Sequence, residues 1–218
     1  MFNDNPFVTD CSADPVDIAT DGVVEMMRLG GIEMFSMSAV ARWAGRTRSA
    51  MHQRHGSSEA FVVAVTERFC LRWTRWVTRT GSEVLSPVRL PRHPNETNGV
   101  RAWRAIRLVA DGERRAGRLA ASVSVGDALA SERRHIALHL SSRLGRDALA
   151  REVEHVVALA EGLRARVVAT DASISADEAD QILRRHLVDS LGLEVTSGDL
   201  TMEESIAADR TWRDRPAI

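Results

Sequence analysis

The sequence predicts an all-α fold in which a small N-terminal domain of three helices precedes a larger helical domain. Apolar residues recur every three or four positions over most of the chain, which is the spacing of one face of a helix. Glycine and hydroxyl residues separate these segments, as they do where helices end and begin. No proline occurs between residues 100 and 191, and the alternation typical of strands is rare there.

A first helix is expected from about residue 15 to 29. Asp14 can accept hydrogen bonds from the free amides of the first turn, and Pro15 suits that turn because it lacks an amide hydrogen. Asp17 stands at the positive end of the helix, where a carboxylate is favourable. Gly30 and Gly31 supply the flexible backbone that ends the helix.

Two short helices are expected next. Ser36 can cap a helix from Met37 to Ala44, which Gly45 ends, and Thr47 can cap a second helix through Arg54. Two short helices on either side of a tight glycine turn are typical of a helix-turn-helix, a motif whose second helix enters the major groove of DNA.

A long helix is expected from about Glu59 to about Thr80. It carries a row of arginines that we interpret as a solvated or interdomain face: Arg68, Arg72, Arg75 and Arg79. Residues 86–99 contain three prolines, which predicts a linker or long loop rather than a regular helix.

The C-terminal part shows two apolar helix faces. One runs from Leu149 to Val167 at intervals of three and four residues, and the other runs from Ala179 to Leu191 after a cap at Ser173 or Ser175. Pairing these faces across a twofold axis would bury both, which predicts a homodimer. The expected interface residues are Val153, Val156, Ala160, Leu163, Val167, Ile182, Leu183, His186 and Leu187.

Composition excludes several classes of protein. No apolar run approaches the roughly 18 residues of a membrane span, and the first residues lack the pattern of a secretory signal, so we expect a cytoplasmic protein with no membrane partner. Cys11 and Cys70 are the only cysteines, which excludes a disulfide framework and predicts reduced thiols. Neither a nucleophile motif nor a phosphate-binding glycine loop occurs, so we expect no enzyme activity and no cofactor.

Charge is unevenly distributed, although the net charge is only -1. Between Glu33 and Glu59 there is no acidic residue, and that window contains four arginines: Arg42, Arg46, Arg48 and Arg54. Phosphate binding requires such a local concentration of positive charge. From charge alone, a solvated basic face explains the window as well as a DNA-binding site does.

The stretch from Gly31 to Phe61 resembles the TetR/AcrR family of bacterial transcriptional regulators. The residues that carry the resemblance are Ser36-Met37, Val40-Ala41, Ala44-Gly45, Thr47, Met51, Ser57 and Glu59-Ala60-Phe61. Residues 158–191 also resemble the last two helices, through which members of this family dimerise. The resemblance covers about a third of the chain.

The resemblance implies a dimeric repressor that is released from a near-palindromic DNA operator by a small-molecule effector of unknown identity. Its domains would be residues 14–58 for DNA binding, 59–192 for effector binding and dimerisation, and a polar tail at 193–218. The residues expected to contact DNA are Ser36, Arg46, Thr47, Arg48, Ser49, His52, Arg54 and Ser58.

The sequence departs from the family pattern inside and around the second short helix. His52 replaces an aromatic residue, His55 a phenylalanine, Ser58 a lysine and Arg46 an apolar residue. These departures support an alternative, in which the chain keeps the fold but acts as a ligand-binding or protein-interaction module without sequence-specific DNA binding.

Two further groups of residues leave alternatives open. His135 and His139 are one helical turn apart, but no third ligand follows from the spacing, so no metal site is expected. Trp76, Trp103 and Met202 are candidates either for the lining of an effector pocket or for the core.

Overall fold

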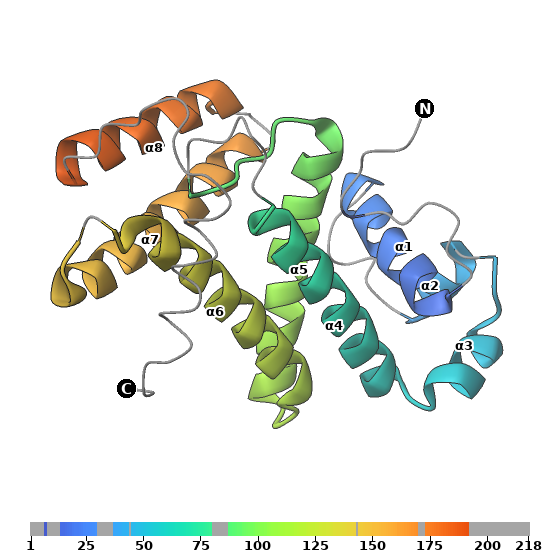
Figure 1. Cartoon of the computed structure of the whole chain (residues 1–218). Coiled ribbons are helices and arrows are strands. Elements are labelled where there is room, and N and C mark those ends of the chain that lie inside the picture. The colour runs from blue at the N-terminus through green and yellow to red at the C-terminus, as the bar shows by residue number, and fades with distance from the viewer. Residues whose placement is uncertain are drawn as a thin grey trace.

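The computed structural model describes residues 7, 14–29, 37–43, 45–79, 87–142, 144–169 and 173–191, and in this part the chain is all-α, as predicted (Figure 1). No helix within it is long and apolar enough to cross a membrane. The helices are α1 (Pro15–Leu29), α2 (Met37–Trp43), α3 (Arg48–His55), α4 (Ser58–Val77), α5 (Pro94–Arg115), α6 (Ala120–Leu140), α7 (Arg146–Val167) and α8 (Ala176–Leu191).

Local capping starts the N-terminal helices where the sequence predicts. The Asp14 carboxylate accepts a hydrogen bond from the Val16 amide at 2.9 Å. The Thr47 hydroxyl accepts one from Ala50 at 3.1 Å, and the Ser57 hydroxyl one from Ala60 at 3.0 Å. Each bond satisfies an amide that has no partner within its helix. The expected cap at Ser36 and the glycine pair at 30–31 lie outside the described residues.

The expectation of a linker or loop over residues 86–99 is wrong for its second half, because α5 begins at Pro94. Proline is tolerated in the first turn of a helix, since its missing amide hydrogen has no helical acceptor there. Gly99 then lies against Phe7, and a Cβ on this glycine would clash with the Phe7 ring. The segment therefore combines a helix start with a close contact that requires glycine.

A first apolar core joins the helices from α1 to α6. Its centre is a group of aromatic rings in which Trp73 and Trp103 stack at 4.6 Å between centroids. Phe69 stacks on Phe7 at 5.7 Å, and Phe7 is also fully buried. Because α4 contributes Phe69, Trp73 and Trp76, this long helix links the N-terminal helices to the rest of the molecule (Figure 1).

A second core lies between α6, α7 and α8. The predicted apolar seam of α7 is covered here by its own chain: Val156 and Ala160 are fully buried, and Leu163 is 4% exposed. Leu183 and Leu187 of α8 are buried in the same core. The premise that these faces need a second chain to cover them is therefore wrong, since α6 packs against the seam as well.

Ion pairs hold α1 against α4. The Arg72 guanidinium is buried and donates to the Asp17 carboxylate at 2.8 Å and to Asp21 at 2.5 Å. Arg68 donates to Asp17 at 2.9 Å and to Asp14 at 3.0 Å. Half of the predicted arginine row therefore contacts α1 and the Asp14 that caps it, whereas Arg75 and Arg79 are exposed.

Candidate functional site

A tight turn sets the position of α3. The Gly45 amide donates to the Arg42 carbonyl at 3.2 Å, and the Arg46 amide donates to the Ala41 carbonyl at 2.8 Å. Gly45 has a φ of 64°, a conformation that other residues rarely adopt. The turn and the Thr47 cap together fix the direction in which α3 leaves α2.

Helix α3 presents polar side chains to solvent. Met51 alone is buried among its residues, while His55 is half-buried. The predicted DNA-contacting residues that the structure describes are all exposed: Arg46, Thr47, Arg48, Ser49, His52, Arg54 and Ser58. Ser36 lies outside the described residues. A basic, exposed helix after a glycine turn fits the major groove of DNA in size and charge.

Three of these side chains have partners that bear on their roles. The Thr47 hydroxyl is the α3 cap, so this residue positions the helix as well as facing solvent. The His52 ring nitrogen Nδ1 lies 3.2 Å from the Gly56 carbonyl oxygen at the other end of α3. Arg54 lies 3.9 Å from Asp14 in an exposed pair, a contact that leaves its guanidinium available to other anions.

His55 is the last residue of α3, and its ring lies edge-on to Phe61 of α4 at 5.3 Å. Its Nε2 atom is buried and has no hydrogen-bond partner among the described residues. Burial, together with the charge of Arg54, lowers the pKa of His55 despite the opposing effect of Asp14. The ring therefore fills an apolar position while carrying a polar atom that the surroundings do not satisfy.

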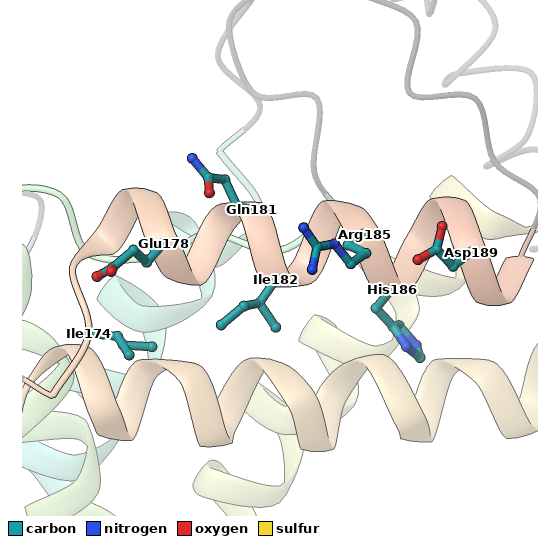
Figure 2. Close-up of a pocket in the computed structure, with 7 residues that line it drawn as sticks. All are labelled: Ile174, Glu178, Gln181, Ile182, Arg185, His186 and Asp189. Atoms are coloured by element: carbon teal, nitrogen blue, oxygen red, sulfur yellow. The ribbon is translucent and has the colours of Figure 1, made fainter.

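One face of α8 borders a groove of about 490 Å³. Figure 2 shows Ile182 and His186 pointing from α8 toward the neighbouring helix, with Glu178 and Arg185 beside them. Ile182 is 41% exposed, which is high for an isoleucine. Of the nine expected interface residues, Ile182 and His186 therefore line this groove. Val167 is half-buried. The other six are buried within the chain: Val153, Val156, Ala160, Leu163, Leu183 and Leu187.

A smaller cavity of about 190 Å³ is bordered by α4, α5 and α7 and opens to solvent beside the exposed Arg104. Trp103, one of the candidate pocket residues, lines this cavity. Trp76 is buried in the core and donates from its indole nitrogen to Glu96 at 3.0 Å. Met202 lies outside the described residues.

Sequence reasoning missed the buried charged residue that lines this cavity. Arg164 is 3% exposed, and its guanidinium donates to the Glu132 carboxylate at 2.5 Å and to the Arg89 carbonyl at 2.9 Å. The same guanidinium lies 5.2 Å from the Trp73 ring centre. Glu132 is 32 positions away from Arg164 in sequence, so no local pattern could reveal the pair.

The remaining candidate residues form no site of their own. The rings of His135 and His139 lie edge-on at 4.4 Å, and the described residues contain no group of three side chains able to hold a metal ion.

Cys70 is buried in α4, where burial and the nearby carboxylates of Glu67 and Asp127 raise the pKa of its thiol to about 12. This thiol is therefore unreactive at neutral pH.

The described residues are all-helical and include two short helices joined by a tight glycine turn, a cavity bordered by α4, α5 and α7, and a groove along α8. The fold is similar to a solved structure from Rhodococcus sp. that is assigned to the TetR family of transcriptional regulators. The similarity has a TM-score of 0.58 at 16% sequence identity and covers 81% of this chain and 97% of the other. No family model matches the sequence, and no curated protein does. The chain therefore has the TetR-family fold.

Proposed function

We propose that the protein is a homodimeric, DNA-binding transcriptional repressor of the cytoplasm, without catalytic activity or cofactor, that a small-molecule effector releases from a near-palindromic operator. The observation that carries the proposal is the exposed basic surface of α3, which the Gly45 turn and the Thr47 cap hold in a fixed direction. The fold similarity to a TetR-family regulator supports it.

Within this surface the side chains divide by position. Residues 46–49 and 52 lie in the turn and on the first turns of α3, where base edges are within reach. Arg54 and Ser58 lie outside that region, and we propose that they contact phosphates, as does Ser36, which precedes α2 in the sequence. Gln53 and Arg42 are exposed beside them and extend the set, since an amide can pair with adenine and a guanidinium with phosphate.

Selection from a random pool of duplex DNA tests the proposal. We expect a symmetric motif with half-sites about one helical turn apart, or a multiple of it, roughly 35 Å per turn. The affinity for that motif should fall steeply as salt rises, because phosphate contacts release counterions. Failure to recover any symmetric motif would contradict sequence-specific binding.

A second candidate function rests on His55 and His52. The unsatisfied His55 nitrogen and the contact of His52 with the end of its own helix favour a chain that keeps the fold as a ligand-binding or protein-interaction module. This alternative predicts that weak DNA binding persists without sequence preference, whereas ligand binding remains intact. The same selection experiment therefore separates the two functions.

A further inference from the structure

We propose that Phe7 is a positioning residue for the DNA-binding helices. Its ring lies in the core between α4 and α5 and holds α1 at one angle to α4, and α2 and α3 follow α1 because they pack against it in sequence. The role of Phe7 in DNA binding rests on the proposed function. Its hold on α1 follows from the packing and is tested without DNA.

The Phe7 ring enters the first core from a point in the chain before α1 begins at Pro15. The ring is fully buried, and its centre lies 5.7 Å from Phe69, 5.4 Å from Trp76 and 6.3 Å from Trp73. These three residues recur at helical spacing and therefore lie on one face of α4. One face of α4 thus surrounds the ring with aromatic contacts, which favour offset and tilted geometries of this kind.

Helix α5 closes the other side of the Phe7 ring. Gly99 lies against the ring, and a Cβ at this position would clash with it. A glycine in the interior of a helix is less stable than an alanine there. The second glycine of α5, Gly112, has no atom within 4 Å of the place where its Cβ would lie. Only the first of these two glycines is therefore required by a close contact.

The backbone of Phe7 shares a hydrogen-bond donor with α1. The buried Arg72 donates from Nη1 to the Phe7 carbonyl oxygen at 2.5 Å and to the Asp21 carboxylate at 2.5 Å. Its Nη2 atom donates to the Asp17 carboxylate at 2.8 Å. A guanidinium presents its donors in a rigid fork, so moving one acceptor changes the geometry available to the others. The position of Phe7 and the position of α1 are therefore coupled through one side chain.

The same core continues from Phe7 to the DNA-contacting helix. Ala19 and Val23 of α1, Val40 of α2 and Met51 of α3 all belong to it. Closely packed interiors transmit displacements, so the angle of α3 depends on where α1 is held. In a dimer, two α3 helices must match the spacing of two half-sites. If α1 samples several angles, the affinity for one spacing falls in proportion to the fraction of molecules at the matching angle.

Two glycine variants of the full-length protein test the contact itself. Gly112→Ala adds a Cβ into open space and should raise the melting temperature slightly, because alanine favours the helix. Gly99→Ala should lower it by about 3 °C or more, because the added Cβ displaces the Phe7 ring. In a Phe7→Ala background the ring is absent, so adding Gly99→Ala should cause no further loss. If Gly99→Ala alone is as stable as Gly112→Ala, Phe7 does not occupy this position and the proposal is overturned.

Amide hydrogen exchange of the protein without DNA tests the hold on α1. Phe7→Leu keeps an apolar side chain and should speed exchange of the buried amides of α1 by about tenfold or more. Exchange in α7 should change less than about twofold, because the second core does not contain Phe7. Val125→Ala on α6 removes packing from the first core and should not single out α1. Equal acceleration in α1 and α7 by Phe7→Leu would make Phe7 a general core residue and contradict the proposal.

A DNA measurement tests the positioning role. The motif recovered by selection is rebuilt with its half-sites moved closer together or farther apart. Phe7→Leu should bind the preferred spacing about threefold more weakly or less, and discriminate less among spacings, with the half-site sequence unchanged. Val125→Ala should keep the spacing preference. An unchanged spacing preference in Phe7→Leu overturns the role in DNA binding. If the unmodified protein yields no motif, the proposed function fails together with this role, and the exchange experiment alone decides whether Phe7 holds α1.

Discussion

At position 55 an imidazole ring occupies a half-buried site against Phe61, with its Nε2 atom buried and unsatisfied among the described residues. Leaving a buried polar atom without a hydrogen bond costs about 1–3 kcal/mol. We therefore expect His55→Phe to raise the free energy of unfolding by about 1 kcal/mol, measured by chemical denaturation.

His93 provides a matched control, because this histidine is exposed and makes no side-chain cap at the start of α5. His93→Phe should change the free energy of unfolding by no more than about 0.5 kcal/mol. A loss of stability in His55→Phe would mean that the imidazole is satisfied in solution and that the phenyl ring does not fit.

The lowered pKa of His135 predicts that the folded protein loses stability in mild acid. Burial and, to a smaller extent, the adjacent His139 lower the pKa of His135 from 6.5 to about 4. As the pH falls below 6.5 the unfolded chain binds a proton before the folded chain does, so the free energy of unfolding decreases until about pH 4. This decrease is up to about 3 kcal/mol.

Thermal unfolding followed between pH 7 and pH 4 measures this effect. His135→Gln should reduce the fall in melting temperature, whereas His93→Gln, at an exposed position, should leave it unchanged. An equal pH dependence in all three proteins would show that His135 does not control acid stability.

At the scale of elements, the helices that begin with a local signal were predictable from the sequence. Asp14, Thr47 and Ser57 each accept a hydrogen bond from an amide of the helix that follows them. Such bonds span only two or three residues, so sequence spacing determines them. The exposed surface of α3 was predictable for the same reason, since its caps and its buried Met51 fix which side faces solvent.

The partners of helix faces were not predictable in this way. Periodicity identified the α7 seam as apolar, but an apolar face does not specify whether its own chain or a second chain covers it. The start of α5 at Pro94 depends on the position of proline within the first turn, which composition alone does not give. The Arg164–Glu132 pair joins two distant helices and leaves no local pattern.

The two ends of α3 give a prediction about DNA binding. Arg48 is the first residue of α3, where a guanidinium can bind guanine through two hydrogen bonds, a contact worth roughly 1–3 kcal/mol of discrimination. Arg54 lies in the last turn and is expected to meet phosphate instead. Selection experiments should show that Arg48→Ala relaxes the preference at one base pair, while Arg54→Ala weakens binding to all sequences alike.

Salt dependence separates the two roles further. Losing one phosphate contact should reduce the slope of log affinity against log salt by about 1 in Arg54→Ala. Arg75→Ala, at an exposed position on α4 outside the site, should change neither the motif nor the slope. An unchanged motif in Arg48→Ala would show that Arg48 does not contact a base.

At the scale of the whole molecule, α4 and α6 connect the parts that the proposed function requires. Helix α4 carries the Arg72 pairs with α1 at one side and Trp73 of the cavity at the next residue. Helix α6 contributes to both apolar cores, through Ala128 to the first and Ile136 to the second. Packed helices therefore connect the cavity with α1 on one side and with the core of α7 and α8 on the other.

The final prediction concerns dimerisation. Because Leu163 is buried within the protomer, the exposed Ile182 is the better residue for the test. Leu163 is 4% exposed within one chain, so Leu163→Glu should unfold the protomer by placing a charge in its core. Ile182 is 41% exposed on the grooved face of α8. If this face meets its twofold copy, Ile182→Glu should leave the melting temperature of the protomer nearly unchanged and weaken association at least tenfold, because the charge is buried only in the dimer.

Light scattering across a concentration series measures this association. The unmodified protein should be a dimer at micromolar concentration, and Ile182→Glu should shift to a monomer over the same range. Leu108→Glu provides the control, because Leu108 is 59% exposed on α5 and does not line the α8 groove, so a charge there should leave the dimer intact. A monomeric unmodified protein would contradict the homodimer, and an unaffected Ile182→Glu dimer would show that the chains meet through another surface.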